Sequence, residues 1–346
     1  MKLKRVKSDS AVEVFVSGKG IKSVIIIPGG RRIVGSVYKY AKLISKFSDV
    51  YIHWAIGFNR FKREMERIEP DFVFVWGDGQ TNYAFAQRLG LSYVLVEMDV
   101  FSLRWGDMKA HWFEPDMVKG AEKIICTSKL HAEYLKKKYK VESLIIPLKP
   151  FSEDLEFSPK PKIPGGNNLV YAGSLVGSKD RHAPYGYRYY IPYFKKLKAL
   201  GWNIHLYPGY ELSNDRIDEY DNAGFTIHNH IAQNELYREL SQYDVGFHGY
   251  NKEGVPEVSF NYSQMCLPNK TWEYLAAGIP TISYNGGFSS DFIKEGGWGK
   301  KLRTLNKEFS IDNIKITYKM RHENIIDPYV EDLKKLLGIV QNANIS

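Results

Sequence analysis

The sequence predicts an α/β protein of two domains, each built on a parallel β-sheet. Short apolar runs alternate with helical patterns along most of the chain, which is typical of parallel sheets whose strands are joined by helices. This alternation is interrupted from residue 147 to residue 166, where five prolines lie among charged residues without periodicity. With 346 residues the chain is long enough for two cores. We expect domains over residues 1–148 and 167–325, a linker over 149–166, and a C-terminal helix and tail over 326–346.

The first domain opens with the apolar run 23–28, which reads as a buried parallel strand. Gly29 and Gly30 follow it and precede a helical pattern over residues 33–47, the usual opening of a Rossmann-like unit. A tight turn without a binding role is the alternative for the two glycines. A helix is expected at 60–69, and Asn59 is expected to cap its N-terminus. Further strands are expected at 50–54, 71–76, 92–97, 123–127 and 141–148, and helices at 82–89 and 129–139, the latter capped by Ser128.

The second domain repeats the pattern and ends in an amphipathic helix. Its strands are expected at 168–172, 203–207, 225–228, 244–248 and 281–284. The segment 181–198 is dense in tyrosine and basic residues, so it is expected either to contact a ligand or to pack as a helix from Pro192 with Phe194 and Leu197 in the core. The last helix is expected at 328–337.

Two carboxylates follow strands of the first predicted sheet. Ligand groups in parallel sheets lie just beyond the carboxyl ends of the strands. Asp99 follows the strand at 92–97 and precedes an aromatic segment over 100–112 that we expect to be irregular, so it is a candidate general base. A turn or cap role is the alternative. Asp78, at the end of the preceding strand, is the competing candidate, and Arg104 is expected to line the same side.

The stretch 267–284, L-P-N-K-T-W-E-Y-L-A-A-G-I-P-T-I-S-Y, reads as loop, short helix, stop and strand. Pro268 and Asn269 are start signals, and Gly278 followed by Pro280 is a stop signal.

Lys270 falls in the first turn of this helix, where free backbone N–H groups and the positive end of the helix dipole favour phosphate. Glu273 lies one turn further on the same face, and its carboxylate can accept hydrogen bonds from two sugar hydroxyls. An ordinary surface ion pair between the two is the alternative.

The string P-N-K-x-W-E-Y-L-A-A-G-x-P resembles the donor-site helix of GT-B glycosyltransferases, which have two Rossmann-like domains and use nucleotide sugars. The resemblance implies that Lys270 contacts the donor diphosphate and that Glu273 holds the nucleotide ribose. Gly173 and Ser174, after the strand at 168–172, resemble the loop that opens the GT-B donor domain and approaches the diphosphate. Either Lys179 or Arg181 is expected to add positive charge near this loop.

Other blocks extend the resemblance. Asn229, His230 and Ile231 resemble the loop that contacts the nucleotide base. The resemblance also implies that Gly29 and Gly30 face a central cleft between parallel sheets, that the terminal helix crosses back onto the first domain, and that Asp99 is catalytic. Met265 stands where retaining GT-B families often carry a second glutamate, so retaining and inverting chemistry both stay open.

Composition restricts the partners. The formal net charge of +9 favours an anionic partner, such as nucleotide phosphates, an anionic membrane surface or nucleic acid. Two distant cysteines suggest a reducing compartment. The basic N-terminus lacks the apolar core of a secretion signal, and no apolar run is long enough to span a bilayer. We therefore expect a cytoplasmic protein, with peripheral binding at the inner membrane face as an option.

The predicted function is transfer of a hexosyl group from a nucleotide sugar to an acceptor hydroxyl, with a lipid-linked or surface glycan as first choice of acceptor. The donor is expected to be a UDP-sugar, with a GDP-sugar as the alternative. No D-x-D sequence occurs, and the three histidines His228, His230 and His248 fit no usual ligand spacing, so no obligatory metal or other cofactor is expected. Two alternatives remain: a phage-type DNA glucosyltransferase, and a non-catalytic protein that binds nucleotide sugars or nucleic acid.

Overall fold

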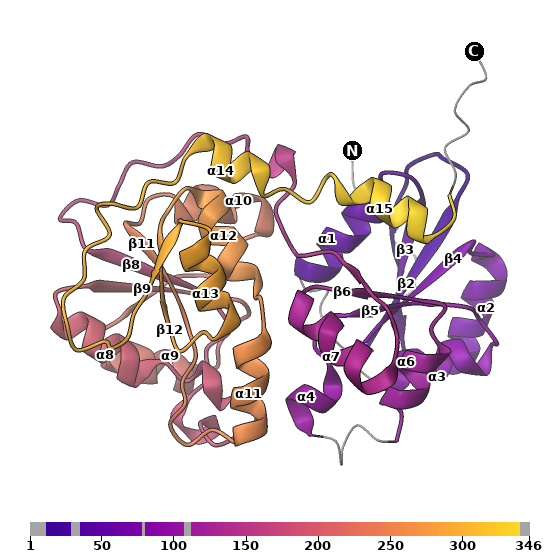
Figure 1. Ribbon diagram of the computed structural model, residues 1–346, viewed down its shortest axis with the longest axis horizontal. Helices are drawn as coiled ribbons and strands as arrows, with labels where there is room; N and C mark the ends of the chain where they lie inside the picture. The colour runs from indigo at the N-terminus through magenta and orange to yellow at the C-terminus, as the bar shows by residue number, and fades with distance from the viewer. Residues whose placement is uncertain (1–11, 29–34, 78–79, 107–111, 340–346) are drawn as a thin grey trace. The chain divides into compact units, whose positions relative to one another are not determined.

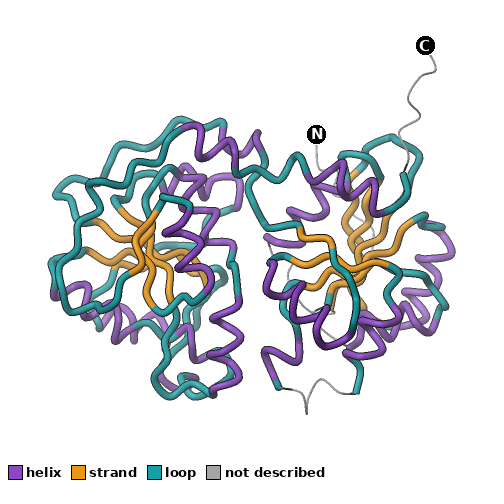
Figure 2. Tube along the Cα trace, in the orientation of Figure 1, coloured by secondary structure: helices purple, strands orange, loops and turns teal. Residues whose placement is uncertain are grey.

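The computed structural model describes residues 12–28, 35–77, 80–106 and 112–339. The chain divides into two compact units, one running to Leu148 and resuming at Ile326, the other spanning Lys149–Ile325 (Figure 1). Residues 149–166, predicted as a linker, belong to the second unit, where Phe151 and Leu155 are buried. In each unit strands are flanked by helices, which confirms the predicted α/β class (Figure 2).

The first unit contains a sheet with the strand order β1-β3-β2-β4-β5-β6-β7 among the described residues. Every neighbouring pair is parallel except β1 and β3, which are antiparallel. The strand β1 was not predicted, because four residues are too few for a periodic pattern to be recognised. The strands are β1 (Val12–Phe15), β2 (Lys22–Pro28), β3 (Asp49–Ala55), β4 (Phe72–Trp76), β5 (Val94–Glu97), β6 (Lys123–Cys126) and β7 (Leu144–Ile145).

The helices of the first unit include one from the C-terminal part of the chain. Helix α15 packs against α1, which confirms the predicted return of the terminal helix to the first unit. The predicted cap at Asn59 is wrong: α2 starts at Phe58, so Asn59 lies inside the first turn and Gly57 occupies the cap position. The helices are α1 (Gly35–Ile44), α2 (Phe58–Ile68), α3 (Gln80–Arg88), α4 (Phe101–Trp105), α6 (Glu114–Gly120), α7 (Lys129–Tyr139) and α15 (Tyr329–Leu336).

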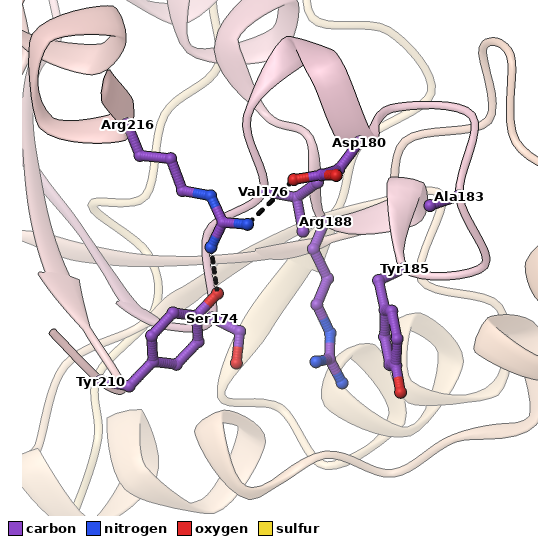
Figure 3. Close-up of a pocket in the computed structure, with 8 residues that line it drawn as sticks. All are labelled: Ser174, Val176, Asp180, Ala183, Tyr185, Arg188, Tyr210 and Arg216. Carbon is purple, nitrogen blue, oxygen red and sulfur yellow. Dashed lines mark hydrogen bonds and ion pairs between the residues drawn. The ribbon is translucent and has the colours of Figure 1, made fainter. Parts of the chain in front are cut away.

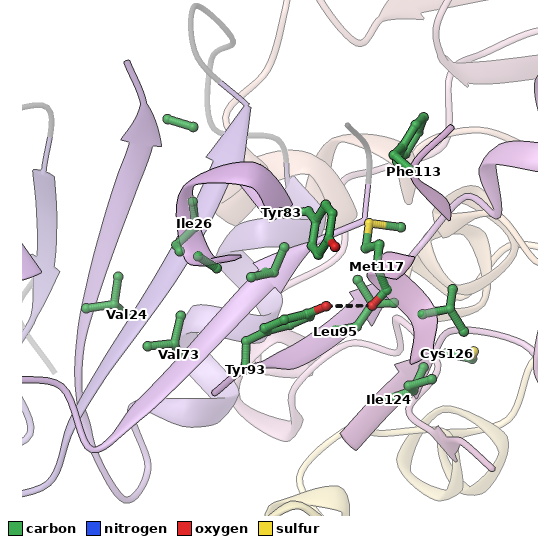
Figure 4. Close-up of a cluster of buried hydrophobic side chains, with 14 of the residues drawn as sticks. Val24, Ile26, Val73, Tyr83, Tyr93, Leu95, Phe113, Met117, Ile124 and Cys126 are labelled. Atoms are coloured by element: carbon green, nitrogen blue, oxygen red, sulfur yellow. Dashed lines mark hydrogen bonds between the residues drawn. The ribbon is translucent and has the colours of Figure 1, made fainter. Parts of the chain in front are cut away.

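A buried cluster fills the space between one face of this sheet and helices α2, α3, α6 and α7. Strand residues such as Val24, Val73 and Leu95 contribute one side of it, and Met117 of α6 belongs to the same cluster and lies near Leu95 (Figure 4). The hydroxyl of Tyr93 donates a hydrogen bond to the carbonyl of Met117 at 2.7 Å, so the polar end of a buried ring is satisfied. One face of the sheet is therefore packed in the core of this unit.

The second unit contains a parallel sheet with the order β10-β9-β8-β11-β12-β13. The chain proceeds outward from β8 in one direction and then restarts at β11 on its other side. Ligands of doubly wound sheets bind beyond the carboxyl ends of the strands at such a switch point. The strands are β8 (Asn168–Gly173), β9 (Asn203–Pro208), β10 (Thr226–Ile227), β11 (Val245–Gly249), β12 (Thr281–Tyr284) and β13 (Gly299–Lys301).

Two buried clusters cover opposite faces of this sheet. Tyr171 of β8 packs with Phe194 and Tyr220 on one face, whereas the next residue, Ala172, packs with Tyr274 on the other. This alternation follows from the two-residue period of a strand. The helical elements are η1 (Ser152–Leu155), η2 (Ser178–Asp180), η3 (Gly186–Arg188), α8 (Ile191–Ala199), α9 (Asn214–Asn222), α10 (Gln233–Leu240), α11 (Glu257–Met265), α12 (Asn269–Ala277), α13 (Phe288–Glu295) and α14 (Tyr318–Glu323).

The segment 181–198 divides into two parts. Its second half is α8, with Phe194 and Leu197 buried and Lys195 exposed, which confirms packing in the core for that half. Its first half forms η3 and carries Arg188. In the part of the chain that the structure describes, no helix is both long enough and apolar enough to cross a bilayer.

Candidate functional site

Helix α12 starts and ends where the sequence predicts. It begins at Asn269 after Pro268, and Gly278 ends it in the left-handed conformation, with φ of 76°. The hydroxyl of Tyr274 accepts a hydrogen bond from the Ala172 amide at 3.0 Å and donates one to the Phe247 carbonyl at 3.1 Å. Because these bonds tie α12 to β8 and β11, the first turn of the helix lies at the carboxyl edge of the central strands.

The amine of Lys270 is held in an aromatic surrounding at this edge. It donates a hydrogen bond to the Tyr171 hydroxyl at 2.9 Å and lies 4.2 Å from the centre of that ring. The Tyr171 hydroxyl in turn donates to the Ser174 carbonyl at 2.9 Å. The pKa of Lys270 is lowered to about 7, mainly by burial and also by the positive charge of Arg188, while Glu273 opposes the shift. An anion placed beside this amine would be strongly favoured, because it would offset the cost of the buried positive charge.

Gly173 closes β8 in a conformation that side chains rarely adopt, with φ of 145°. A Cβ atom there would lie 3.2 Å from the Tyr171 hydroxyl and 3.6 Å from Cε of Lys270. The carbonyl of Gly173 accepts a hydrogen bond from the Gly209 amide at 3.1 Å, which joins the loops after β8 and β9. The structure thus brings the predicted diphosphate residues Gly173, Ser174 and Lys270 together.

Glu273 is 8% exposed and Lys270 is 9% exposed, so they are not a solvated surface pair. The interpretation of K-x-x-E as an ordinary surface ion pair is therefore wrong. Burial raises the pKa of Tyr237 on α10 and the carboxylate of Glu273 adds to the increase, so Glu273 lies near this tyrosine.

Arg188 is a functional candidate that sequence reasoning did not single out. It lies near Lys270, whose pKa it lowers, and its guanidinium lies 5.1 Å from the ring of Tyr187. The density of tyrosine and basic residues at 181–198 was the available signal, but it could not rank the cations. Lys179, one of the two cations predicted there, instead pairs with Asp215 at 2.8 Å on the surface. Arg181 donates from Nε to Nε2 of His182 at 2.9 Å.

The predicted base-binding residues lie between β10 and α10. Asn229 and His230 are exposed, and Ile231 is half-buried against the cluster that contains Tyr237 and Tyr274. This loop therefore shares a core with α12. Its outer residues are open to a ligand.

A flat aromatic stack precedes this loop. The rings of Tyr207 and His228 lie 4.3 Å apart at 7°, and Nδ1 of His205 lies 3.1 Å from Nε2 of His228. Burial lowers the pKa of both histidines, that of His205 to about 4. Both imidazoles are therefore neutral near pH 7. Among the described residues, no group of three or more histidine, cysteine or acidic side chains is arranged to hold a metal ion.

The first unit brings together two other predicted residues. Asp99 Oδ2 lies 2.7 Å from Arg104 Nη1, and the side chains are 32% and 7% exposed respectively. His131, buried at the start of α7, has its pKa lowered to about 4 by burial, with the charge of Asp99 acting in the opposite direction. The carboxylate of Asp99 is therefore accessible to solvent, and the guanidinium of Arg104 compensates its negative charge. Gly29, Gly30 and Asp78 lie outside the described residues.

Helix α4 replaces part of the irregular segment predicted at 100–112, and that prediction is wrong for residues 101–105. Glu114, which is fully buried, explains why the helix forms. Its carboxylate accepts hydrogen bonds from the Ser102 amide at 2.9 Å and from the Tyr139 hydroxyl at 2.5 Å. These contacts hold α4 against α6 and α7 and so fix the helix that carries Arg104.

No known family profile matches the chain. No curated protein matches it either. Solved structures do. Sucrose-phosphate synthase from Thermosynechococcus elongatus superposes with a TM-score of 0.62 and 12% identity, over 92% of this chain and 98% of that one. An α,α-trehalose-phosphate synthase (UDP-forming) from Burkholderia xenovorans, in complex with glucose-6-phosphate, superposes with a TM-score of 0.60 and 9% identity, over 92% and 100%.

A third structure, Alr3699/HepE from Anabaena in complex with UDP-glucose, superposes with a TM-score of 0.55 and 10% identity, over 92% of each chain. The chain has the GT-B fold. This result confirms the fold expected from the donor-helix motif. In this GT-B protein, Gly173, Ser174, Lys270 and Glu273 converge at the carboxyl edge of the second sheet.

Proposed function

We propose that this GT-B protein is a glycosyltransferase that moves a hexosyl group from a nucleotide sugar to an acceptor hydroxyl. The observation that supports this most is the environment of Lys270. Its amine is buried against the Tyr171 hydroxyl, lies beside the Gly173 loop, and is close enough to Arg188 for that charge to lower its pKa. An anionic group bound here would offset the cost of a positive charge buried near a second cation.

The donor is proposed to lie across the carboxyl edge of the second sheet. Its diphosphate would contact Lys270, the backbone of Gly173 and Ser174, and the free N–H groups of the first turn of α12. Its ribose hydroxyls would donate to Glu273, and its base would contact residues 229–231. Donors aimed at the leaving diphosphate stabilise the charge that develops as the glycosidic bond breaks. A UDP-sugar is the first choice and a GDP-sugar the second; the Anabaena protein of the same fold binds UDP-glucose.

Asp99 is proposed to accept the proton of the attacking acceptor hydroxyl. Its carboxylate is 32% exposed, and the ion pair with Arg104 fixes its orientation. The acceptor is proposed to be a lipid-linked or surface glycan. The net charge of +9 is consistent with an acceptor presented at an anionic membrane surface.

A thermal-shift screen against UDP-, GDP- and ADP-sugars tests the donor. A ligand that binds only the native state stabilises the protein, by about 2.7 kcal/mol when its concentration is a hundred times Kd, and so raises the melting point of the protein. We expect one nucleotide series to raise the melting point, Lys270→Met to abolish the increase, and Lys196→Met, which removes an exposed lysine of α8, to leave it unchanged. No increase with any nucleotide sugar, or an increase retained by Lys270→Met, would contradict the proposal.

Activity measurements separate the alternatives. Slow hydrolysis of the donor that binds supports a transferase, whereas tight binding without hydrolysis or transfer supports a binding protein. DNA binding that weakens steeply with salt and needs no donor supports a DNA glucosyltransferase. Binding to anionic but not neutral liposomes supports a glycan acceptor at a membrane.

A further inference from the structure

A pocket with a volume of about 340 Å³ lies beside the Gly173 loop (Figure 3). It is formed by the loops after β8 and β9 together with α9, and its size suits a group as large as one sugar ring. Val176 and Ala183 are its apolar side chains. Its polar and charged side chains are Ser174, Asp180, Tyr185, Arg188, Tyr210 and Arg216.

This pocket lies on the opposite side of β8 from the proposed nucleoside position. Arg216 belongs to α9, and α8 and α9 cover the face on which Tyr171 packs. Ile231 of the proposed base loop packs instead with Tyr274 on the α10 and α12 face. The Gly173 loop therefore lies between this pocket and the proposed position of the nucleoside. The diphosphate of a donor would lie between them.

Positive charge exceeds negative charge in the pocket. Arg216 Nη2 pairs with Asp180 at 2.9 Å, and its Nη1 donates to the Tyr210 hydroxyl at 3.3 Å. That hydroxyl donates to the Leu175 carbonyl at 2.8 Å, so the guanidinium of Arg216 is held in one orientation. Arg188 lies alongside Tyr185, with 5.8 Å between its guanidinium carbon and the ring centre (Figure 3). The residues that line the pocket thus include two guanidinium groups and one carboxylate.

We propose that this pocket binds the phosphate or carboxylate group of an anionic sugar. Guanidinium groups bind both anions through paired N–H donors, and the tyrosine rings with Val176 and Ala183 offer surface for the apolar face of a sugar ring. The role of the anionic sugar as a substrate rests on the proposed function of the protein. The binding of an anion by Arg188 and Arg216 is independent of that function. The other possible source of the anion is the diphosphate of the donor.

Isothermal titration of the full chain with glucose 1-phosphate, glucuronate and glucose tests this assignment. Each titration is run alone and with a saturating amount of the nucleotide that gives the largest thermal shift. We expect one or both anionic sugars to bind in both conditions, and glucose to bind at least about tenfold more weakly, since it lacks the charged group that accepts hydrogen bonds from guanidinium.

Two variants should change the affinity in opposite directions. Arg216→Met should weaken binding of the anionic sugar about tenfold, because it removes one guanidinium. Asp180→Asn should tighten binding about threefold, because Asp180, 47% exposed, no longer competes for Arg216. Arg303→Met, which removes an exposed arginine of the same unit, is the matched control and should change nothing. Damage to the fold would not produce an increase in one variant and a decrease in the other.

The assignment is overturned if the nucleotide displaces both anionic sugars, because the pocket would then belong to the donor diphosphate. It is also overturned if glucose binds as tightly, if neither anionic sugar binds, or if Arg216→Met and Asp180→Asn leave affinity unchanged. If no nucleotide binds at all, the proposed function fails, but the titrations without nucleotide still show whether the pocket binds an anionic sugar.

Discussion

Lys270 in the second unit and Asp99 in the first are surrounded in opposite ways. Lys270 is 9% exposed, donates to the neutral Tyr171 hydroxyl, and has its pKa lowered to about 7 by burial and by Arg188. Asp99 is 32% exposed and pairs with Arg104 at 2.7 Å. The positive charge of Lys270 is disfavoured in the free protein and would be stabilised by a bound anion. The charge of Asp99 is already compensated within the protein.

This difference assigns different tasks to the two residues. A buried cation close to a like charge gains most when a ligand brings negative charge, so Lys270 should govern binding. An accessible, oriented carboxylate gains little from binding but can take a proton, so Asp99 should govern turnover. Substitutions at these two residues and at their neighbours test this division.

Asp99→Asn should lower transfer at least about a hundredfold, the usual range for loss of a general base, and should leave donor affinity within about twofold. Steady-state transfer assays and donor titrations measure the two quantities. Asp116→Asn, an exposed carboxylate on α6, is the control and should retain activity. Unchanged turnover in Asp99→Asn would move the base to Asp78 or elsewhere.

Donor affinity should fall as pH rises above 7, by up to about tenfold per pH unit. In the free protein Lys270 loses its proton around pH 7, whereas the bound diphosphate keeps the amine charged, so binding takes up a proton in this range. Titrations from pH 6 to pH 9 should show the slope in the native chain and not in Lys270→Met. A flat profile in the native chain would show that the amine does not meet the diphosphate.

The same pKa shift predicts the pH dependence of stability without ligand. The pKa of Lys270 in the folded state is about 7 and its ordinary value is 10.5, so the unfolded chain binds more protons between these values. The contribution of this group to the free energy of unfolding should therefore rise with pH from about 7 to 10.5. Denaturant titrations that compare the native chain with Lys270→Met isolate this contribution, and saturating donor should reduce it.

Glu273→Ala should weaken binding of the nucleotide sugar about tenfold, because ribose hydroxyls lose a charged acceptor. Binding of inorganic pyrophosphate should stay nearly constant, since Lys270 is retained. Glu295→Ala, an exposed glutamate at the end of α13, should affect neither ligand. Equal losses for both ligands would place Glu273 at the diphosphate and not at the ribose.

Gly173→Ala should lower the free energy of unfolding by about 1–2 kcal/mol, because alanine disfavours the backbone conformation and its Cβ would lie 3.2 Å from the Tyr171 hydroxyl. Gly165→Ala provides the comparison: φ is 94°, but no atom lies within 4 Å of the added Cβ. Urea unfolding should show the larger loss at Gly173. An equal loss at both positions would mean that the contact with Tyr171 contributes nothing.

Local sequence determined the elements that carry their own signals. The helix at 269–277 has its start at Pro268 and its stop at Gly278, and α7 has the cap that Ser128 provides, with Oγ accepting from the His131 amide at 3.2 Å. The buried parallel strands were recognisable because they are continuous apolar runs, whereas the parallel strand β13, which has no buried residue, was not predicted. The donor motif itself is local, since Lys270 and Glu273 are one helical turn apart.

Tertiary structure alone decided which side chains meet. Lys270 and Tyr171 are 99 residues apart, and only the packing of α12 on β8 and β11 brings the amine to that hydroxyl. Arg188 belongs to a segment whose composition could not rank its cations, and the start of α4 is held by Glu114, twelve residues further on, which accepts from the Ser102 amide. Periodicity and caps depend on a few neighbouring residues, whereas charge environment depends on contacts between segments far apart in the chain, and only the folded chain contains those.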